Sequence, residues 1–198
     1  MPNLSSMTEL DAVNEMLVSI GQAPVNTLSV SGVRDVNIAR AELTKVSRQV
    51  QLQGWHWNTD EAYSLNRDVD GHIVAPAGVL KFEPLEGDRQ VVLRRGTKGM
   101  QLYDKDAQSF VFTANVTARV VWGFSFDDLP ETARVYIAIA AARKFQARVI
   151  GSRELDGFNA EDEQRAWATL IREERGTRNT NMFARNPTLK RSTLYRGF

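Results

Sequence analysis

The sequence predicts an α+β fold, in which a four-helix, bundle-like subdomain carries an antiparallel β-sheet subdomain inserted between its second and third helices. Apolar residues recur every three or four positions near the N-terminus and again after residue 127, a spacing typical of helices. Between these regions, residues 116–126 alternate apolar and polar side chains, which is typical of a strand with one buried face. The expected boundaries are 1–54 and 127–184 for the helical subdomain, 55–126 for the β subdomain and 185–198 for a basic C-terminal tail.

The first helix is expected over about residues 8–20. Thr8 is suited to cap its N-terminus, because Asp11 follows at the spacing of a capping box. Gly21 and Pro24 follow the last apolar residue in the order that usually ends a helix.

The second helix is expected over about residues 33–53. Its apolar residues have the spacing of a coiled-coil seam and are Val36, Ala39, Leu43, Val46 and Val50. The opposite face is polar and includes Arg40 and Arg48, and Gly54 is the expected residue just past the helix end. Residues 55–57, Trp-His-Trp, are expected to begin the first strand, with the two indoles on opposite faces as anchors.

The middle of the chain is expected to form a few short antiparallel strands, about four to six of them. The pattern of residues 91–103 indicates a hairpin with a basic, glycine-containing turn, and a second turn is expected at residues 103–110. Helix three is expected to start at residues 127–130, where Asp128 can cap it and Pro130 suits an early helical position, and to end at Gly151. Helix four is expected to start near residue 159 and to fade by residue 178.

The composition excludes several kinds of site. The 25 Lys and Arg against 24 Asp and Glu leave a formal charge of +1, which argues neither for nor against nucleic acid. The absence of cysteine excludes a disulfide scaffold, a thiolate zinc site and a cysteine nucleophile. His56 and His72 are too few for a histidine triad, so we expect no metal and no cofactor. Because the N-terminal residues do not resemble a signal peptide and no apolar run approaches the roughly 20 residues of a membrane span, we expect a cytoplasmically made chain that enters no membrane.

No catalytic residue is predicted. Residues 123–127, GFSFD, lack the second glycine of a nucleophile elbow, so Ser125 is interpreted as an ordinary strand residue. Residues 94–99, RRGTKG, are not a P-loop; a hairpin turn is the favoured interpretation, and a loop that contacts phosphate or a partner is the alternative. Carboxylates cluster at residues 127–128, 161–163 and 173–174, where a helix cap, a first helical turn and a solvated face account for them.

The C-terminal segment is basic, because residues 175–198 contain six basic residues and no acid. Phosphate contact, docking into an acidic and partly apolar groove of a protein, and simple fraying are the open interpretations. Docking to a protein is favoured, because the interleaved apolar side chains would gain little from phosphates. The predicted partner-interface residues are Arg40, Arg48, Arg94, Arg95, Lys98, Arg185, Lys190, Arg191, Tyr195, Arg196 and Phe198.

Several stretches of the sequence resemble the tail tubular protein A family of T7-like podoviruses, also called head-to-tail adaptors or gatekeepers. They are TELDAVNEMLVSIGQAPVNTL (residues 8–28), VNIARAEL (36–43), VSRQVQLQGWHWNTDEA (46–62) and DDLPETARVYIAIAAARKFQARVIGSRE (127–154). The resemblance spans most of residues 8–175, and its most specific parts are residues 20–28 and 53–58.

The resemblance implies a structural virion protein of a short-tailed phage. Such a protein forms a dodecameric ring between the portal protein and the tail nozzle, tubular protein B, and DNA passes through its lumen without sequence-specific contacts. The helical part is expected to pack around the ring and engage the portal, and the sheet part to face the nozzle. We further expect a monomer before assembly, made in the host cytoplasm and later found in the virion tail, with no cofactor and no enzymatic activity.

Two other hypotheses follow from the residues. A tail-associated hydrolase that degrades polysaccharide is the first, and it requires two acids in one concave pocket. A DNA-binding module is the second, and it would work through the C-terminal tail and the turn at residues 94–98.

Overall fold

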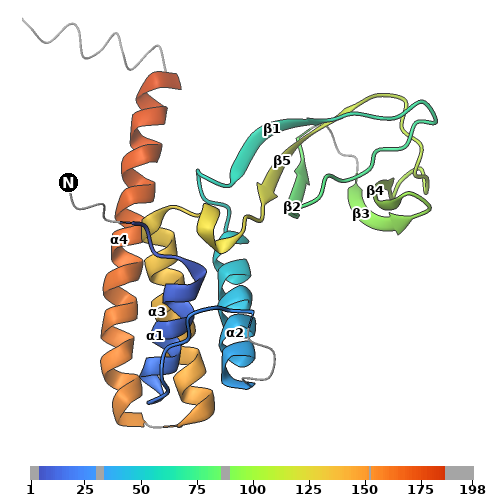
Figure 1. The fold of residues 1–198 in the computed structure, drawn as a ribbon. Coiled ribbons are helices and arrows are strands. Elements are labelled where there is room, and N and C mark those ends of the chain that lie inside the picture. The colour runs from blue at the N-terminus through green and yellow to red at the C-terminus, as the bar shows by residue number, and fades with distance from the viewer. Residues whose placement is uncertain (1–4, 30–33, 86–89, 152, 186–198) are drawn as a thin grey trace, which may run out of the picture. The chain divides into compact units, whose positions relative to one another are not determined.

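The computed structural model describes residues 5–29, 34–85, 90–151 and 153–185, and the chain divides into two compact units (Figure 1). The helical unit comprises residues 1–47 and 125–198, and the β unit comprises residues 48–124. The described helices are α1 (Glu9–Ser19), α2 (Arg34–Gln51), α3 (Glu131–Val149), α4 (Arg153–Arg185) and the short 3-10 helix η1 (Phe126–Asp128). The described strands are β1 (Thr59–Leu65), β2 (Val79–Pro84), β3 (Val91–Gly96), β4 (Gly99–Asp104) and β5 (Val116–Trp122). The predicted α+β class is confirmed.

The N-terminus of α1 has the predicted capping box. The Thr8 hydroxyl accepts a hydrogen bond from the Asp11 N–H at 3.2 Å, and the Thr8 N–H donates to the Asp11 carboxylate at 2.9 Å. Asp127, far away in the sequence, adds to this cap, because its carboxylate accepts a hydrogen bond from the Glu9 N–H at 2.8 Å. Three of the free N–H groups at this helix end are therefore satisfied by carboxylate or hydroxyl oxygens.

Glycines lie just past the ends of α1 and α2, as predicted. Gly21 has a φ of 79°, and the following residue, Gln22, donates its N–H to the Leu17 carbonyl at 3.0 Å. Gly54 has a φ of 76°, a left-handed conformation that glycine adopts without strain because it has no Cβ.

Apolar faces of α1, α2 and α3 provide most of the described buried residues of the helical unit. The seam predicted along α2 is confirmed, since Val36, Ala39, Leu43, Val46 and Val50 are all at most 4% exposed. The buried residues of α1 are Ala12, Val13, Met16 and Leu17. The buried apolar residues of α3 are Ala133, Ile137, Ala138, Ala140, Ala141 and Phe145. The small side chains of α3 permit close approach, and α3 packs against both α1 and α4.

The prediction that Asp128 caps helix three is wrong. Asp128 ends η1, and its carboxylate accepts a hydrogen bond from the Ser125 hydroxyl. Leu129 then adopts an extended conformation with ψ of 154°, and Pro130 occupies the N-cap position of α3 without a side-chain hydrogen bond. The extended residue separates Asp128 from the helix, so its carboxylate is used in the preceding turn.

Helix α4 is longer than predicted, because it begins at Arg153 and continues to Arg185. The prediction relied on an apolar stripe, and among the residues with described side chains only Leu170 and Glu174 of α4 are buried. Glutamate, arginine and glutamine continue a helix through their intrinsic propensity and leave no apolar spacing to detect.

The described residues of the β unit form two antiparallel sheets, where the sequence predicts one. Strand β5 lies between β1 and β2 in a three-stranded sheet, and β3 and β4 form a separate two-stranded sheet. The hairpin predicted at residues 91–103 is confirmed, with Gly96 opposite Gly99 at its turn. The apolar core of this unit consists of Leu65, Ile73, Val91, Leu102, Phe112, Val116, Ala118 and Val120. Strand β5 ends at Trp122, so the alternation expected to reach residue 126 stops early.

The two tryptophans after α2 do not anchor a strand on opposite faces, and that prediction is wrong. Strand β1 begins only at Thr59, and residues 56–58 form a turn. The rings of Trp55 and Trp57 stack almost parallel, with their centroids 6.4 Å apart. Alternation of side chains applies to an extended chain, whereas this turn brings both indoles to the same side.

Candidate functional site

A buried polar junction fixes the points where the chain enters and leaves the β unit. Asn58 is 0% exposed, and its side-chain oxygen accepts a hydrogen bond from the Trp55 N–H at 2.8 Å. Its amide nitrogen donates to the Gln51 carbonyl at 2.9 Å and to the Trp122 carbonyl at 2.8 Å. Gln51 makes two further bonds to the backbone of Phe124, at 3.1 and 2.7 Å. The junction therefore ties the end of α2 to the end of β5.

Asn58 and Gln51 are not among the residues predicted from the sequence to have a special role. The structure shows that both are buried and polar. A turn-forming asparagine beside two tryptophans was the available signal. Its partners at residues 51 and 122 are brought to it only by the folded chain. The tryptophan segment is thus structural, as expected, although by a different geometry from the one predicted.

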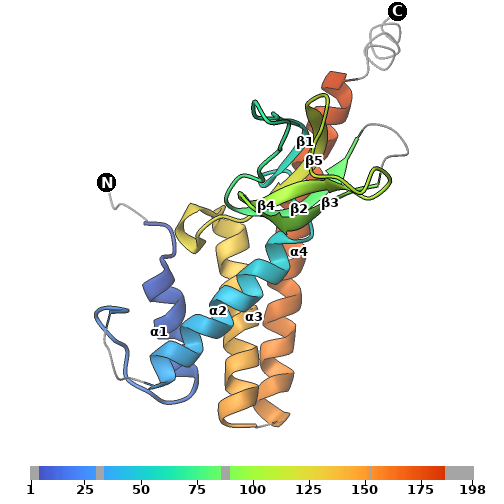
Figure 2. The same ribbon diagram turned by 90° about the vertical axis from the view of Figure 1, so that its right-hand side faces the viewer.

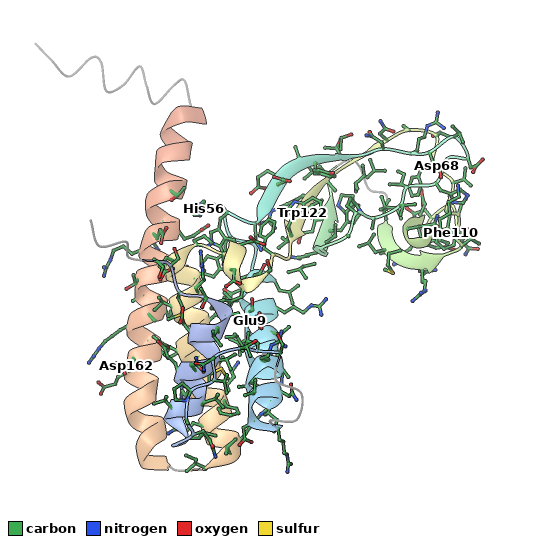
Figure 3. The ribbon with its side chains drawn as sticks, viewed as in Figure 1. Glu9, His56, Asp68, Phe110, Trp122 and Asp162 are labelled. Carbon is green, nitrogen blue, oxygen red and sulfur yellow. The ribbon has the colours of Figure 1, made fainter. Side chains whose placement is uncertain are left out.

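Two of the predicted interface residues lie on α2. The Arg40 side chain donates to the Glu9 carboxylate at 3.0 Å, so its charge is already paired within the helical unit (Figure 3 labels Glu9). Arg48 is exposed, and no ion pair between described residues involves it. Of the two, Arg48 has the charge that is available to a partner.

Three more of the predicted interface residues lie on the β3–β4 hairpin. The Arg94 guanidinium lies 4.1 Å from the centre of the Tyr103 ring, and Arg95 is exposed. The Lys98 ammonium contacts Asp68 at 2.6 Å and Asp70 at 2.7 Å (Asp68 is labelled in Figure 3). The hydrogen bond from Lys98 to Asp68 lowers the pKa of Asp68 and raises the pKa of Lys98, so both side chains stay ionised at neutral pH. Arg94 and Arg95 therefore provide the uncompensated charge of this turn.

The remaining predicted residues belong to the C-terminal segment. Arg185 is the last residue of α4. Those that lie outside the described residues are Lys190, Arg191, Tyr195, Arg196 and Phe198.

A hollow of about 480 Å³ lies on the helical unit among α1, α3 and α4. Its apolar lining on α3 is Val135, Ile139 and Ala142, which are half-buried and spaced one helical turn apart. The polar and small side chains around it are Glu15, Ser19, Arg143, Asp162, Arg165, Ala166 and Thr169. A second hollow shares Glu15 and Ser19 and continues along α1 past Val18, which is 58% exposed. We call the two hollows together the α1–α4 groove.

Charged side chains of opposite sign line this groove. Arg143 pairs with Glu163 at 2.9 Å, and Arg165 contacts Asp162 at 3.5 Å (Asp162 is labelled in Figure 3). No ion pair between described residues involves Glu15. Desolvation by the surrounding helices, followed by the negative charge of Asp11, raises the pKa of Glu15.

The groove is not among the features predicted from the sequence, although the acids at residues 161–163 are part of the prediction. The spacing of Asp11 and Glu15, one helical turn apart, with the apolar Val18 close by in the sequence, was an available local signal. Two acids, Glu15 and Asp162, do share this hollow. The hollow is open to solvent and also contains two arginines, whereas a glycosidase holds its carboxyl pair across an enclosed cleft.

Other kinds of site leave no trace in the described part of the chain. No group of three or more His, Asp or Glu side chains there is arranged to hold a metal ion. Among the described helices, none combines the length and apolar character that crossing a membrane requires. The interpretation of Ser125 as a strand residue is wrong, because β5 ends at Trp122; Ser125 lies just before η1, and its hydroxyl donates to the Asp128 carboxylate.

Comparisons with known proteins agree with one another. The family model described as tail tubular protein matches residues 10–180, a range that includes both units. Tail tubular protein A of Klebsiella phage KP34 is 26% identical over 167 residues, which cover 84% of this chain and 87% of that protein. Neither match supports the polysaccharide hydrolase hypothesis. The chain therefore belongs to the tail tubular protein family and is a structural protein of a phage tail.

Proposed function

We propose that this chain is one copy of a ring that joins the portal of the capsid to the tail nozzle, and that DNA passes through the lumen of this ring. The family match over residues 10–180 is the observation that carries the proposal. The match includes the helical and the β unit, so the role concerns the whole chain rather than one unit. Twelve copies are proposed, because the family that the sequence resembles forms dodecamers.

The two units are proposed to serve different partners. The helical unit packs against its copies and engages the portal, and the β unit faces the nozzle. Exposed charges are available for such contacts on the β unit, where Arg94 and Arg95 are the uncompensated cations of the hairpin. Arg48 on α2 and the basic residues after Arg185 are proposed to make further partner contacts. Contacts of DNA with the lumen are proposed to be nonspecific, because they involve phosphate charge rather than base edges.

The role is proposed to be structural rather than catalytic. Several carboxylates of the helical unit are used by caps and ion pairs, as Asp11 and Asp127 are at the N-terminus of α1. No reducing sugar is expected on incubation with capsular or cell-wall polysaccharide. Release of reducing ends by the purified chain, lost in Glu15→Gln and Asp162→Asn variants, would restore the hydrolase hypothesis.

Reconstitution with the partners tests the proposed function. The purified chain is mixed with the portal and the nozzle protein of the same phage and analysed by sedimentation velocity and negative-stain electron microscopy. We expect a slowly sedimenting monomer alone, a large ring-bearing complex with the portal, and a longer tube when the nozzle protein is added. Failure to bind either partner over the micromolar range would overturn the proposal.

Variants then separate the proposed contacts. Arg94→Ala with Arg95→Ala is expected to weaken nozzle binding, whereas Lys105→Ala, an exposed cation near the far end of the same hairpin, serves as the matched control. Removal of residues 186–198 is expected to weaken binding to the portal. Portal binding that survives this truncation unchanged would contradict the contribution of the tail and leave the ring itself intact.

A further inference from the structure

The α1–α4 groove leaves an apolar stripe of α3 partly open to solvent. Val135, Ile139 and Ala142 lie along it at one-turn spacing and are only half-buried. Val18 extends the apolar surface along α1 and is 58% exposed. A stripe of this kind gains stability when another helix covers it, because burial removes its apolar area from water.

The walls of the groove carry more acid than base. Three carboxylates line the groove, namely Asp11, Glu15 and Asp162. Two more, Glu163 and Glu161, form ion pairs with the arginines that line it. The guanidinium groups are Arg143 and Arg165. Five negative and two positive charges leave a net charge of −3 around the groove. Desolvation by the surrounding helices, followed by the negative charge of Asp11, raises the pKa of Glu15, and a cation beside Glu15 would relieve the repulsion.

An exposed stripe of opposite charge lies on another helix of the same unit. The exposed residues of α2 lie on the side that faces away from its buried seam. Five of them form what we call the α2 stripe, namely Arg34, Asn37, Ala41, Thr44 and Lys45, and Arg48 and Gln49 are exposed farther along the helix. The stripe contains no acid and two cations, and no ion pair between described residues involves either Arg34 or Lys45. Its middle has a small side chain, Ala41, which would let the helix backbone approach a groove closely.

The two surfaces lie on different flanks of the helical unit. Figure 1 shows α2 on one flank and α4 on the other, with α1 and α3 between them, and Figure 2, seen from the α2 flank, shows α2 crossing in front of α3. The α2 stripe of one molecule therefore cannot fill its own groove, which includes residues of α4. A contact between two different surfaces of identical copies repeats in one direction, and it generates a ring when the rotation between copies closes.

We propose that the α2 stripe of one copy seats in the α1–α4 groove of the next, so that this pair of surfaces is the lateral contact of the ring. Ala41 lies over the apolar stripe of α3, and Arg34 and Lys45 of the entering helix face the acidic walls. The proposal rests on the ring of the proposed function and adds which faces meet and why they recognise each other. It also gives a reason for assembly in one direction only, because two grooves repel each other and so do two α2 stripes.

Crosslinking between introduced cysteines tests the contact directly, because the chain has no cysteine of its own. The full-length chain with Ala41→Cys and Ala166→Cys has one thiol on the α2 stripe and one on the groove wall. It is assembled on the portal and treated with a short bismaleimide. We expect a ladder of covalent multimers under denaturing conditions, since each copy is joined to two neighbours. Either single-cysteine variant is expected to give no ladder.

A matched control uses Ala168→Cys in place of Ala166→Cys. Ala168 is exposed on the same helix but does not line the groove, and the change of side chain is identical. We expect the Ala41–Ala168 pair to crosslink at least about tenfold less than the Ala41–Ala166 pair. Equal crosslinking by both pairs, or rings that form on the portal without any Ala41–Ala166 crosslink, would overturn the inference while the proposed function stands.

Charge reversal provides an independent test. Lys45→Glu alone and Glu15→Lys alone are each expected to weaken ring assembly about tenfold, because an attraction becomes a repulsion at every lateral contact. The chain with both changes regains opposite charges on the two surfaces and is expected to recover most of the assembly. Both positions are exposed, and thermal melting of each variant verifies that the monomer is folded. Normal assembly of both single variants would contradict the inference, and so would a double variant that is as weak as the single ones.

The tests distinguish other occupants of the groove. If the basic segment 186–198 of the same or another copy fills it, truncation of that segment and not Lys45→Glu will abolish assembly, and the inference falls. If the portal fills it, Ala166→Cys will crosslink to the portal instead of to a second copy, with the same consequence. The absence of any ring with the portal contradicts the proposed function itself, and the inference falls with it.

Discussion

Replacement of Asn58 tests whether the polar junction stabilises the β unit. Asn58→Ala removes three short hydrogen bonds, to the Trp55 N–H and to the carbonyls of Gln51 and Trp122, together with a long one from the Thr59 hydroxyl at 3.5 Å. Each short bond contributes about 1 kcal/mol net. The backbone groups that lose their partner lie inside the protein, because Asn58 itself is 0% exposed, so water cannot replace the lost hydrogen bonds. We expect a loss of about 3 kcal/mol in the free energy of unfolding of the β unit.

Urea titration followed by tryptophan fluorescence measures this loss. Trp55, Trp57 and Trp122 belong to the β unit, whereas Trp167 belongs to the helical unit, so a Trp167→Phe background restricts the signal to the β unit. The restriction is needed because two units need not unfold in one step. The matched control is Asn66→Ala in the same unit, where an exposed amide bonds to Asn115 at 2.9 Å, and its expected cost is about 0.5 kcal/mol.

An isosteric variant tests the direction of the hydrogen bonds. Asn58→Asp keeps the acceptor for the Trp55 N–H but directs carboxylate oxygen at two carbonyls, so at neutral pH we expect a cost at least as large as that of Asn58→Ala. The folded state would favour the protonated acid, which can donate, so the penalty should shrink as the pH falls towards the ordinary carboxyl pKa of about 4. A cost for Asn58→Ala below about 1 kcal/mol, or no larger than that of Asn66→Ala, would refute this reasoning.

Three further predictions concern the helical unit. Thr8→Ala removes the capping hydroxyl of α1 and should lower the free energy of unfolding by about 1 kcal/mol in urea titrations. The hydrogen bonds from the Thr8 hydroxyl and N–H lower the pKa of Asp11, so their contribution to the free energy of unfolding is complete above the ordinary pKa of 3.8 and is lost as the pH falls through the lower pKa of the folded state. The loss of stability caused by Thr8→Ala should therefore diminish in strong acid. A loss that does not depend on pH would contradict the role of the carboxylate. Arg148→Ala should lower the free energy of unfolding by about 2 kcal/mol. Arg148 pairs at 2.6 Å with Glu42, which is 3% exposed, so its removal leaves a buried carboxylate without a partner. Glu42→Met in the Arg148→Ala background should recover most of that stability, as measured by thermal melting.

Local patterns predicted the elements whose signals are contained within a few residues. The seam of α2 was predictable because an amphipathic helix repeats its buried residues every three or four positions, and all five are buried. The capping box at Thr8 and the left-handed Gly54 were predictable because each is a bond or a dihedral within one turn. The same reasoning was wrong for Asp128 and for the two tryptophans, where a short turn intervenes.

By itself, the sequence determined the α+β class, the helices with an apolar face and the hairpin predicted at residues 91–103, because burial of one face leaves a periodic pattern along the chain. Only the tertiary structure decided what periodicity does not encode. The bond from Asn58 to residue 122 spans 64 positions, and the α1–α4 groove is assembled from three helices whose crossing leaves part of α3 uncovered. Such features depend on how elements pack against one another. Packing is determined by the shapes of whole faces, and each face is built by residues that are far apart in the sequence.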